Sequence, residues 1–234
     1  PGIMHRRLQE RSSSPALPVF FPADSRTVYE HLVRATAGSA PSAFEPRPIE
    51  DDGCQARFGD LTVSARRLEH TVPTFGYRIV QDDSTGLDKA GLAQRGIEGP
   101  DIGRLQHQGF LETDRGTVEL ADVSVDRAGQ TVAFVLDTSI CDAAIEVAAG
   151  VDLLVCEATY LESEQHLARE RGHMTARDAG WLGREAGARR VALTHFSRRY
   201  TDLSLFAEQA GELHPDVVVA ADLLRIPVPL RERD

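Results

Sequence analysis

The chain has 234 residues, 41% of them apolar, which fits one domain, or one domain with an excursion, around a sizeable core. No apolar run reaches the roughly 18 residues of a membrane span, and no apolar stretch follows the basic start, so we predict a soluble, cytoplasmic protein. The net charge of −10 excludes an evenly basic surface, so any contact with a nucleic acid must come from local clusters of arginine.

The first 80 residues are predicted to contain one helix and several strands. Pro1 begins the sequence without a cap and residues 3–11 could continue a helix, so we expect that preceding sequence is missing. A helix is predicted over 27–37 because its apolar residues recur on one face. The glycine and prolines of 38–48 indicate a loop. Strands are predicted over 17–21, 55–58, 61–68 and 75–80.

Residues 81–116 differ from their surroundings, because they are polar and rich in glycine. They contain one weak helical pattern over 87–94, followed by a break at Gly99-Pro100. An excursion of this length within a compact domain is usually functional or mobile. We therefore predict an inserted flexible arm over 81–116 in an otherwise single domain of residues 1–234.

After Val118 the pattern alternates between strand and helix, which favours an α/β fold with parallel strands. The helix over 176–186 has the clearest start, since Thr175 and Asp178 are spaced as a capping box. Gly150 suits the end of the helix over 140–149. Strands are predicted over 131–136, 152–156, 191–194 and 217–220, and the other helices over 161–170 and 203–213.

Polar residues with metal-binding side chains follow four of the predicted strands. His70, Asp137, Glu157 and His195 each come just after an apolar run. Ligands gather at the carboxyl ends of strands in open α/β sheets, and imidazoles with carboxylates are a recurring way to bind zinc. Each residue alone has an ordinary interpretation, as a hydrogen-bonded histidine or a turn aspartate. Together they predict a metal site at one edge of the sheet.

Three further residues, His173, Arg198 and Arg199, are candidates for chemistry on the substrate. His173 lies on a loop before a helix, where a histidine of near-neutral pKa can donate a proton to a leaving group. Glu157 could orient that histidine. Arg198 and Arg199, next to His195, would suit a phosphate. The alternatives are a surface histidine, a solvated carboxylate and a solvated pair of charges.

The three cysteines indicate neither a disulfide framework nor a further metal site. Cys54, Cys141 and Cys156 are widely spaced and contain no CxxC pair. An odd number at such spacing argues against both a set of disulfides and a thiolate zinc knuckle.

Five segments of the sequence, in order, form a recognisable set: Leu68-Glu69-His70-Thr71-Val72-Pro73-Thr74-Phe75-Gly76-Tyr77-Arg78, Leu136-Asp137-Thr138, Cys156-Glu157-Ala158-Thr159-Tyr160, Gly172-His173-Met174-Thr175-Ala176 and Leu193-Thr194-His195-Phe196-Ser197-Arg198-Arg199-Tyr200. In these segments, and in their order and spacing from residue 60 to the end, the chain resembles ribonuclease Z (tRNase Z), the tRNA 3′-processing endonuclease of the metallo-β-lactamase fold, and in particular its actinobacterial type. Residues 97–105 also resemble the end of that family's flexible tRNA-gripping arm.

The resemblance implies an αββα sandwich that lacks much of its first half in this sequence. It implies two zinc ions per subunit, precursor tRNA as the substrate and a homodimer in which one subunit's arm grips the tRNA that the other cleaves. It makes His70 a ligand of one zinc, His195 a ligand of the other and Asp137 the bridge. His173 and Glu157 would be catalytic, and Arg199, Gly99 and Pro100 would bind substrate.

The sequence departs from the family's pattern in three ways. The His-x-His-x-Asp-His run, which supplies the other zinc ligands, is absent. Cys156 replaces the histidine of a loop that usually contains His-Glu-Ala-Thr, and the arm leans acidic. Two alternatives therefore stay open: another dinuclear hydrolase of this fold acting on small phosphodiesters or esters, and a catalytically incomplete binding or dimerisation module.

Overall fold

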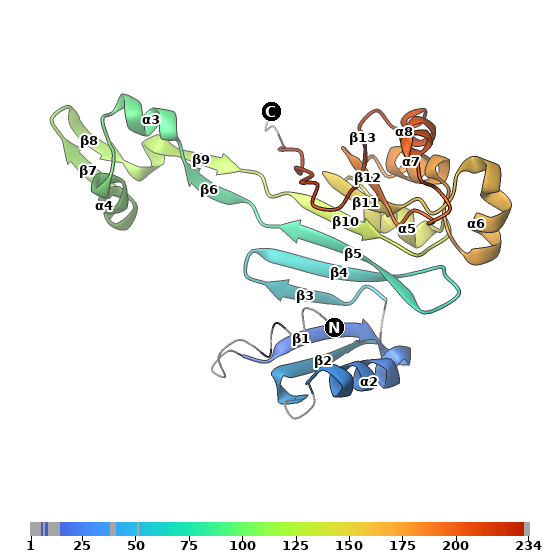
Figure 1. The fold of residues 1–234 in the computed structure, drawn as a ribbon. Coiled ribbons are helices and arrows are strands. Elements are labelled where there is room, and N and C mark those ends of the chain that lie inside the picture. Colours follow the sequence, from blue (N-terminus) through green and yellow to red (C-terminus); the bar gives the residue numbers. More distant parts are fainter. Residues whose placement is uncertain (1–5, 7, 9–14, 38–40, 51, 232–234) are drawn as a thin grey trace. The chain divides into compact units, whose positions relative to one another are not determined.

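The computed structural model describes residues 6, 8, 15–37, 41–50 and 52–231, which form two compact units. The first unit runs up to Val80 and resumes over Thr131–Pro229. The second comprises Gln81–Gln130 together with residues 230 and 231. Figure 1 shows the elements of both units. Within the described ranges, no helix has the length and apolar character needed to cross a membrane.

The first unit contains a mixed sheet, a separate pair of strands and helices. Its helices are α2 (Arg26–Ala37), α5 (Asp142–Ala148), α6 (Gln165–Arg171), α7 (Ala176–Glu185) and α8 (Ser204–Gly211). Its strands are β1 (Leu17–Pro22), β2 (Phe44–Ile49), β3 (Gln55–Phe58), β4 (Leu61–Leu68), β5 (Thr74–Gln81), β10 (Thr131–Val135), β11 (Leu153–Glu157), β12 (Val191–Thr194) and β13 (Val217–Val219).

The mixed sheet has the strand order β13-β12-β11-β10-β5-β4-β3. Strands β10, β11, β12 and β13 pair with one another in parallel, whereas β10 pairs with its other neighbour, β5, in the antiparallel direction. Alternate side chains of a strand point to opposite faces, so Ala133 and Val135 of β10 enter the core beneath α5, α7 and α8. Arg78 of β5 points to the same side and donates to the carbonyls of Val147 and Ala149, which caps the end of α5.

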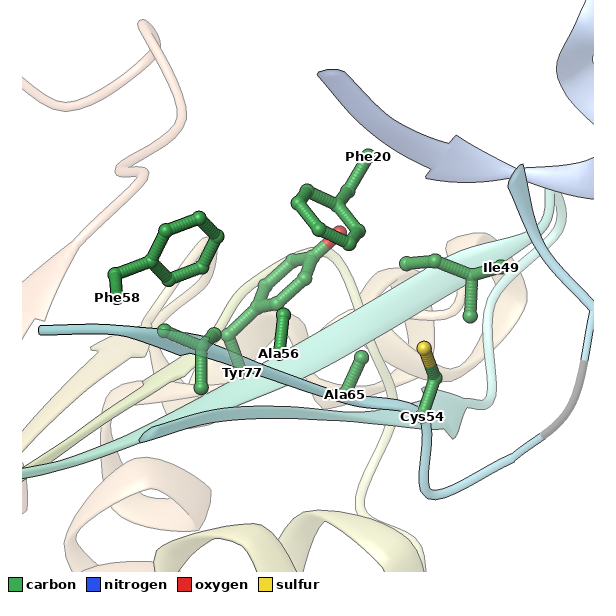
Figure 2. A pocket seen from close by; sticks show the side chains of 8 residues that line it. Phe20, Ile49, Cys54, Ala56, Phe58, Ala65 and Tyr77 are labelled. Atoms are coloured by element: carbon green, nitrogen blue, oxygen red, sulfur yellow. The ribbon is translucent and has the colours of Figure 1, made fainter. Parts of the chain in front are cut away.

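The parallel pair β1–β2 forms a second sheet, covered on one side by α2. Phe21 of β1 packs against Tyr29 of α2, with ring centroids 4.4 Å apart. Phe20 and Ile49 point the other way and pack against Ala65 and its neighbours on β4 and β5. The layers are therefore helices, mixed sheet, β1–β2 and α2. Figure 2 shows a small apolar pocket between the two sheets, lined by Phe20, Ile49, Cys54, Ala56, Phe58, Val63, Ala65 and Tyr77.

The second unit has its own small core. Strand β6 (Ser84–Leu87) pairs antiparallel with β9 (Ser124–Arg127), and β7 (Phe110–Thr113) pairs with β8 (Gly116–Glu119). Helices α3 (Lys89–Gln94) and α4 (Pro100–Gln108) complete it. The buried residues are all aliphatic: Leu92, Ile97, Leu105, Leu111, Val118 and Val123.

Most predicted elements are present, and two predictions were wrong. Residues 38–48 were predicted as a loop, but 44–49 form β2, whose Phe44 and Ile49 are buried and whose prolines are tolerated in a two-stranded edge. The Gly99-Pro100 break is in fact the start of α4, with Gly99 as N-cap at φ 56 and Pro100 in the first turn. The predicted helix over 3–11 lies almost wholly outside the described residues.

Candidate metal centre

Four side chains that could bind a metal meet where parallel strands end. Asp137 lies two residues beyond β10, Glu157 is the last residue of β11, and His195 directly follows β12. Because these strands are parallel neighbours, their carboxyl ends share one edge of the sheet. His173 reaches the same place from the loop after α6. One ligand atom from each of the four lies within 4.8 Å of the others.

The backbone is strained at two of these positions. Asp137 has φ 51 and His195 has φ 58, and in the described part of the chain Leu223 is the only other non-glycine residue with positive φ. A residue with a side chain held in this conformation costs about 1–3 kcal/mol and persists only where its surroundings impose it. Both strained residues lie at strand ends, and their side chains meet there, which is the position a shared ligand requires.

Glu157 is fully buried, yet its carboxylate has a donor for each lone pair. Oε1 accepts from the Thr138 amide at 2.7 Å and from His173 Nδ1 at 2.9 Å. Oε2 accepts from the Thr159 hydroxyl at 2.6 Å and from the Met174 amide at 3.1 Å. A carboxylate with four donors has its hydrogen-bonding capacity filled and no oxygen lone pair left for a metal. We therefore assign Glu157 to the support of the site and exclude it from the ligands.

Thr159 connects the same carboxylate to His195. Its hydroxyl donates to Glu157, so its oxygen accepts from His195 Nδ1 at 2.9 Å. That arrangement fixes the imidazole tautomer and leaves Nε2 with a lone pair. Nε2 lies 2.9 Å from Asp137 Oδ1, which is buried and has no hydrogen-bond donor among the described residues. At this distance a proton or a metal ion can lie between the two atoms, and an imidazole nitrogen with a carboxylate oxygen is a donor set that fits a divalent metal.

His173 is held at the end of α6. Gly172 ends the helix at φ 70, and the His173 amide donates to the Ala168 carbonyl at 2.8 Å, which is the Schellman closure. The hydrogen bond to Glu157 raises the pKa of His173 above its ordinary value, and burial opposes part of that rise. With Nδ1 committed to Glu157, Nε2 is free to hold or donate a proton.

His70 lies beside this histidine. Its Nδ1 donates to the Gly172 carbonyl at 2.9 Å, which leaves Nε2 as the available ligand atom. The ring centroids of His70 and His173 are 4.9 Å apart, although His70 is not a member of the group within 4.8 Å. A Cβ on Gly172 would approach His70 Nδ1 to 3.0 Å, so a glycine suits this position for its space as well as for its φ.

The other predicted site residues fall in different places. Arg199 is exposed, and its Cζ lies 5.2 Å from the ring centroid of Tyr160. Gly99 and Pro100 belong to the second unit, at the start of α4. Cys156 alternates with Glu157 along β11, so its thiol points into the core, where burial raises its pKa well above the ordinary value. The cysteine at this position therefore fills the core and touches no ligand.

Sequence reasoning missed two residues of the site. Thr159 and Thr138 bind Glu157, but a threonine two or three residues after a strand end has no pattern that distinguishes it from a turn residue. The available signal was Glu157 itself. A glutamate at the end of an apolar strand is buried and needs several hydrogen-bond donors, so nearby hydroxyl residues were candidates.

The arrangement has counterparts among known proteins. A family model described as a beta-lactamase superfamily domain matches residues 102–196. A ribonuclease Z of Thermobifida fusca is 41% identical over 239 residues, which cover 100% of this chain and 75% of the relative. A ribonuclease Z of Chlamydia muridarum is 32% identical over 97% of this chain and 75% of the relative.

Solved structures agree on the fold. The short form of human tRNase Z has a TM-score of 0.58 at 18% identity and covers 98% of this chain and 73% of that one. A metallo-β-lactamase fold protein of Bacillus subtilis has a TM-score of 0.59 at 18% identity, over 92% and 66%. The predicted fold is confirmed, and the chain belongs to the ribonuclease Z family, metal-dependent hydrolases of the metallo-β-lactamase fold.

Proposed function

We propose that this chain acts as a zinc-dependent endoribonuclease that removes the 3′ trailer from tRNA precursors, by hydrolysing the phosphodiester 3′ to the discriminator nucleotide. The observation that carries the proposal is the close approach of two metal-binding atoms at the strand ends, His195 Nε2 and Asp137 Oδ1, which face each other at 2.9 Å. It is supported by the relatives, which are named ribonuclease Z.

The proposed ligands are His70 for one zinc, His195 for the other and Asp137 between them, with two ions per subunit. Imidazole nitrogen and carboxylate oxygen are the donors that zinc takes in hydrolytic sites. Both histidines have Nδ1 engaged with a protein oxygen, which fixes Nε2 toward the metal. His70 need not lie within 4.8 Å of every other ligand if it serves a different ion from His195.

The protein's own groups divide the remaining work. Zinc, when bound, supplies an activated water and stabilises the charge that develops on the phosphate. His173 holds a proton at Nε2 for the leaving oxygen, and Glu157 keeps the imidazole oriented and its pKa raised. Arg199 is proposed to contact phosphate, and Gly99 and Pro100 to contact tRNA.

We also propose a homodimer that works in the cytoplasm, in which the arm of one subunit grips the tRNA cleaved by the other. The dimer would let an acidic chain hold a polyanion through a few well-placed contacts rather than through its net charge. Sedimentation of the purified protein at several concentrations tests it, and a monomer at all of them would contradict the dimer.

The cleavage proposal is tested with two substrates and one elemental analysis. Precursor tRNA with a 3′ extension is compared with bis(p-nitrophenyl) phosphate, which offers one phosphodiester and no RNA. Preference for the precursor, with product ending at the discriminator and zinc in the purified protein, is the expected result. Turnover of the chromogenic diester alone would favour a small-phosphodiester hydrolase, and absence of zinc with no turnover would favour a non-catalytic module.

A further inference from the structure

Several arginines near the described strands and helices form ion pairs with carboxylates, in a chain with 36 acidic and 26 basic residues. Arg66 pairs with Asp52 and Glu146, and Arg177 pairs with Glu162 and Glu212. Arg171 and Arg199 are among the exposed arginines that form no ion pair with any residue that the structure describes. They differ from the other unpaired arginines because both contact one side chain, and two guanidinium groups held together can bind an anion.

Both guanidinium groups contact the same side chain, Tyr160. Arg199 Cζ lies 5.2 Å from the centre of the ring, and Arg171 donates to the tyrosine hydroxyl at 3.3 Å. Like charges that converge on one ring repel each other; the carboxylate of Glu164, which interacts with Arg199, offsets part of that repulsion, and a bound anion offsets more. The remaining N–H donors of each fork are free for it, and guanidinium forks match phosphate oxygens.

Tyr160 is a rigid support for the two cations. It is only 3% exposed, and its backbone forms a bridge with Thr175. Its carbonyl accepts from the Ala176 amide at 2.8 Å, which fixes it to the first turn of α7. Arg171, in turn, is the last residue of α6, directly before the Gly172 closure. Both ends of the arrangement are therefore positioned by backbone hydrogen bonds, which limits the entropy lost when a ligand binds.

The location points to the substrate strand. The Tyr160 ring centroid lies 6.2 Å from that of His173, and the positive charge of Arg171 acts on the pKa of that histidine, which it lowers. The two cations thus lie one aromatic ring away from the candidate proton donor. An RNA strand carries a phosphate at every nucleotide, so a second phosphate must lie near the one that reacts.

We propose that Arg171 and Arg199, supported by Tyr160, form a phosphate subsite that holds the RNA phosphate next to the scissile one. Arg171 is then a substrate-positioning residue, and the inference rests on the proposed function as an RNA hydrolase. The alternative is that the arginines only pack against Tyr160 and stabilise the loop.

The test compares Arg171→Gln with Arg169→Gln, since Arg169 lies on the same last turn of α6, is exposed and has no ion pair in the described part of the chain. Binding of a 3′-extended tRNA precursor is measured over a range of salt, with EDTA present to prevent cleavage. Arg171→Gln is expected to weaken binding roughly tenfold. It should also reduce the slope of log K against log salt by about 0.7, the value for one phosphate contact on a single strand.

A modified RNA makes the assignment specific. When the linkage next to the cleavage site is a neutral methylphosphonate, the wild-type protein should lose affinity for the RNA. The Arg171→Gln variant, which already lacks the contact, should bind the modified and the unmodified RNA equally. An unchanged salt slope in the variant, or the same methylphosphonate effect in both proteins, overturns the subsite. So does a fall in the variant's thermal unfolding midpoint that accounts for the lost binding.

Failure of the parent proposal has a different signature. If the wild-type protein does not cleave the precursor but Arg171→Gln still lowers the salt slope, then the trailer-removal proposal is overturned and the subsite stands. If cleavage occurs and Arg171→Gln changes neither KM for the precursor nor the slope, then only the subsite is overturned. Turnover of bis(p-nitrophenyl) phosphate, which has no neighbouring phosphate, should be equal in the wild-type protein and in Arg169→Gln.

Discussion

The two units of the chain use polar side chains in opposite ways. The first unit buries the carboxylate of Glu157 at a sheet edge and surrounds it with four hydrogen-bond donors. This carboxylate orients His173 directly and His195 through the Thr159 hydroxyl. The second unit buries only aliphatic side chains and, among its described residues, contributes nothing to a metal-binding group. Its ten acidic and five basic residues over 81–130 are directed to the surface or to each other.

The difference indicates where function tolerates change. In the first unit each polar contact depends on another, so a single substitution should affect ligands and proton donor together. In the second unit the core is small and its surface can vary without disturbing the chemistry. The predictions below test this contrast, from the largest expected effect to the smallest.

Asp137→Asn should have the largest effect. The amide keeps the shape but removes the charge opposite His195, and zinc content should fall together with activity. We expect kcat for the precursor to fall by roughly 10³-fold, about 4 kcal/mol of transition-state stabilisation. Steady-state kinetics and metal analysis measure both. Asp222→Asn, at an exposed position, is the control, and an active, zinc-loaded Asp137→Asn protein would contradict the ligand assignment.

Glu157→Gln should have the second largest effect, and it should also change the pH dependence of activity. An amide cannot accept at both ends, so at least one buried donor loses its partner, and the free energy of unfolding should fall by roughly 3–5 kcal/mol. Glu157 raises the pKa of His173, and a general acid works while protonated. Activity therefore declines as pH rises through that pKa, and in the variant the decline should begin at lower pH.

Glu170→Gln provides the comparison for this variant, because Glu170 is exposed on α6. The pH profile of kcat and a denaturant titration are measured for all three proteins. An alkaline limb at the same pH in wild type and Glu157→Gln would show that His173 is not the proton donor, whatever the loss of stability.

Replacing the second unit should separate RNA binding from chemistry. The Gln81 amide donates to the Gln130 carbonyl at 2.9 Å, so a short Gly-Ser linker can replace residues 82–129. Turnover of bis(p-nitrophenyl) phosphate should be unchanged, while KM for precursor tRNA should rise by roughly 10- to 100-fold through lost contacts. Equal losses on both substrates would mean that this unit supports the metal centre itself.

The sequence predicted the parts of the site that follow from the apolar runs of the strands and from the polar residues directly after them. Apolar runs ending in His70, Asp137 and His195 indicated a sheet edge with metal-binding side chains. The positive φ values of Asp137 and His195 carry no signal in residue type, because neither is glycine. The strand β2 escaped prediction because Pro46 and Pro48 dominate its local pattern, while the burial of its ends depends on packing.

Thr159→Val should have a smaller and more selective effect. Valine keeps the shape but removes the hydroxyl between Glu157 and His195, so the tautomer of His195 is no longer fixed. Zinc affinity should fall roughly 10- to 100-fold, as it does when such an orienting hydrogen bond is lost. Competition with a chelator measures it, and Thr159→Ser should restore it. An alkaline limb of the pH profile that shifts as in Glu157→Gln would contradict the separate roles of the two contacts.

The smallest expected effect is on the reactivity of the cysteines. It tests whether β11, which ends in Glu157, stays closed to a thiol reagent in the folded protein. Cys156 and Cys141 are buried, and burial raises the pKa of Cys156 well above its ordinary value, whereas Cys54 is half-buried beside the apolar pocket of Figure 2. The thiolate is the reactive form, so Ellman's reagent at neutral pH should modify Cys54 first and the other two only on unfolding. Cys54→Ser should abolish the fast phase. Fast modification of Cys156 in that variant would mean that β11 opens readily, and then the buried carboxylate at its end could not hold His173 and His195 in fixed positions.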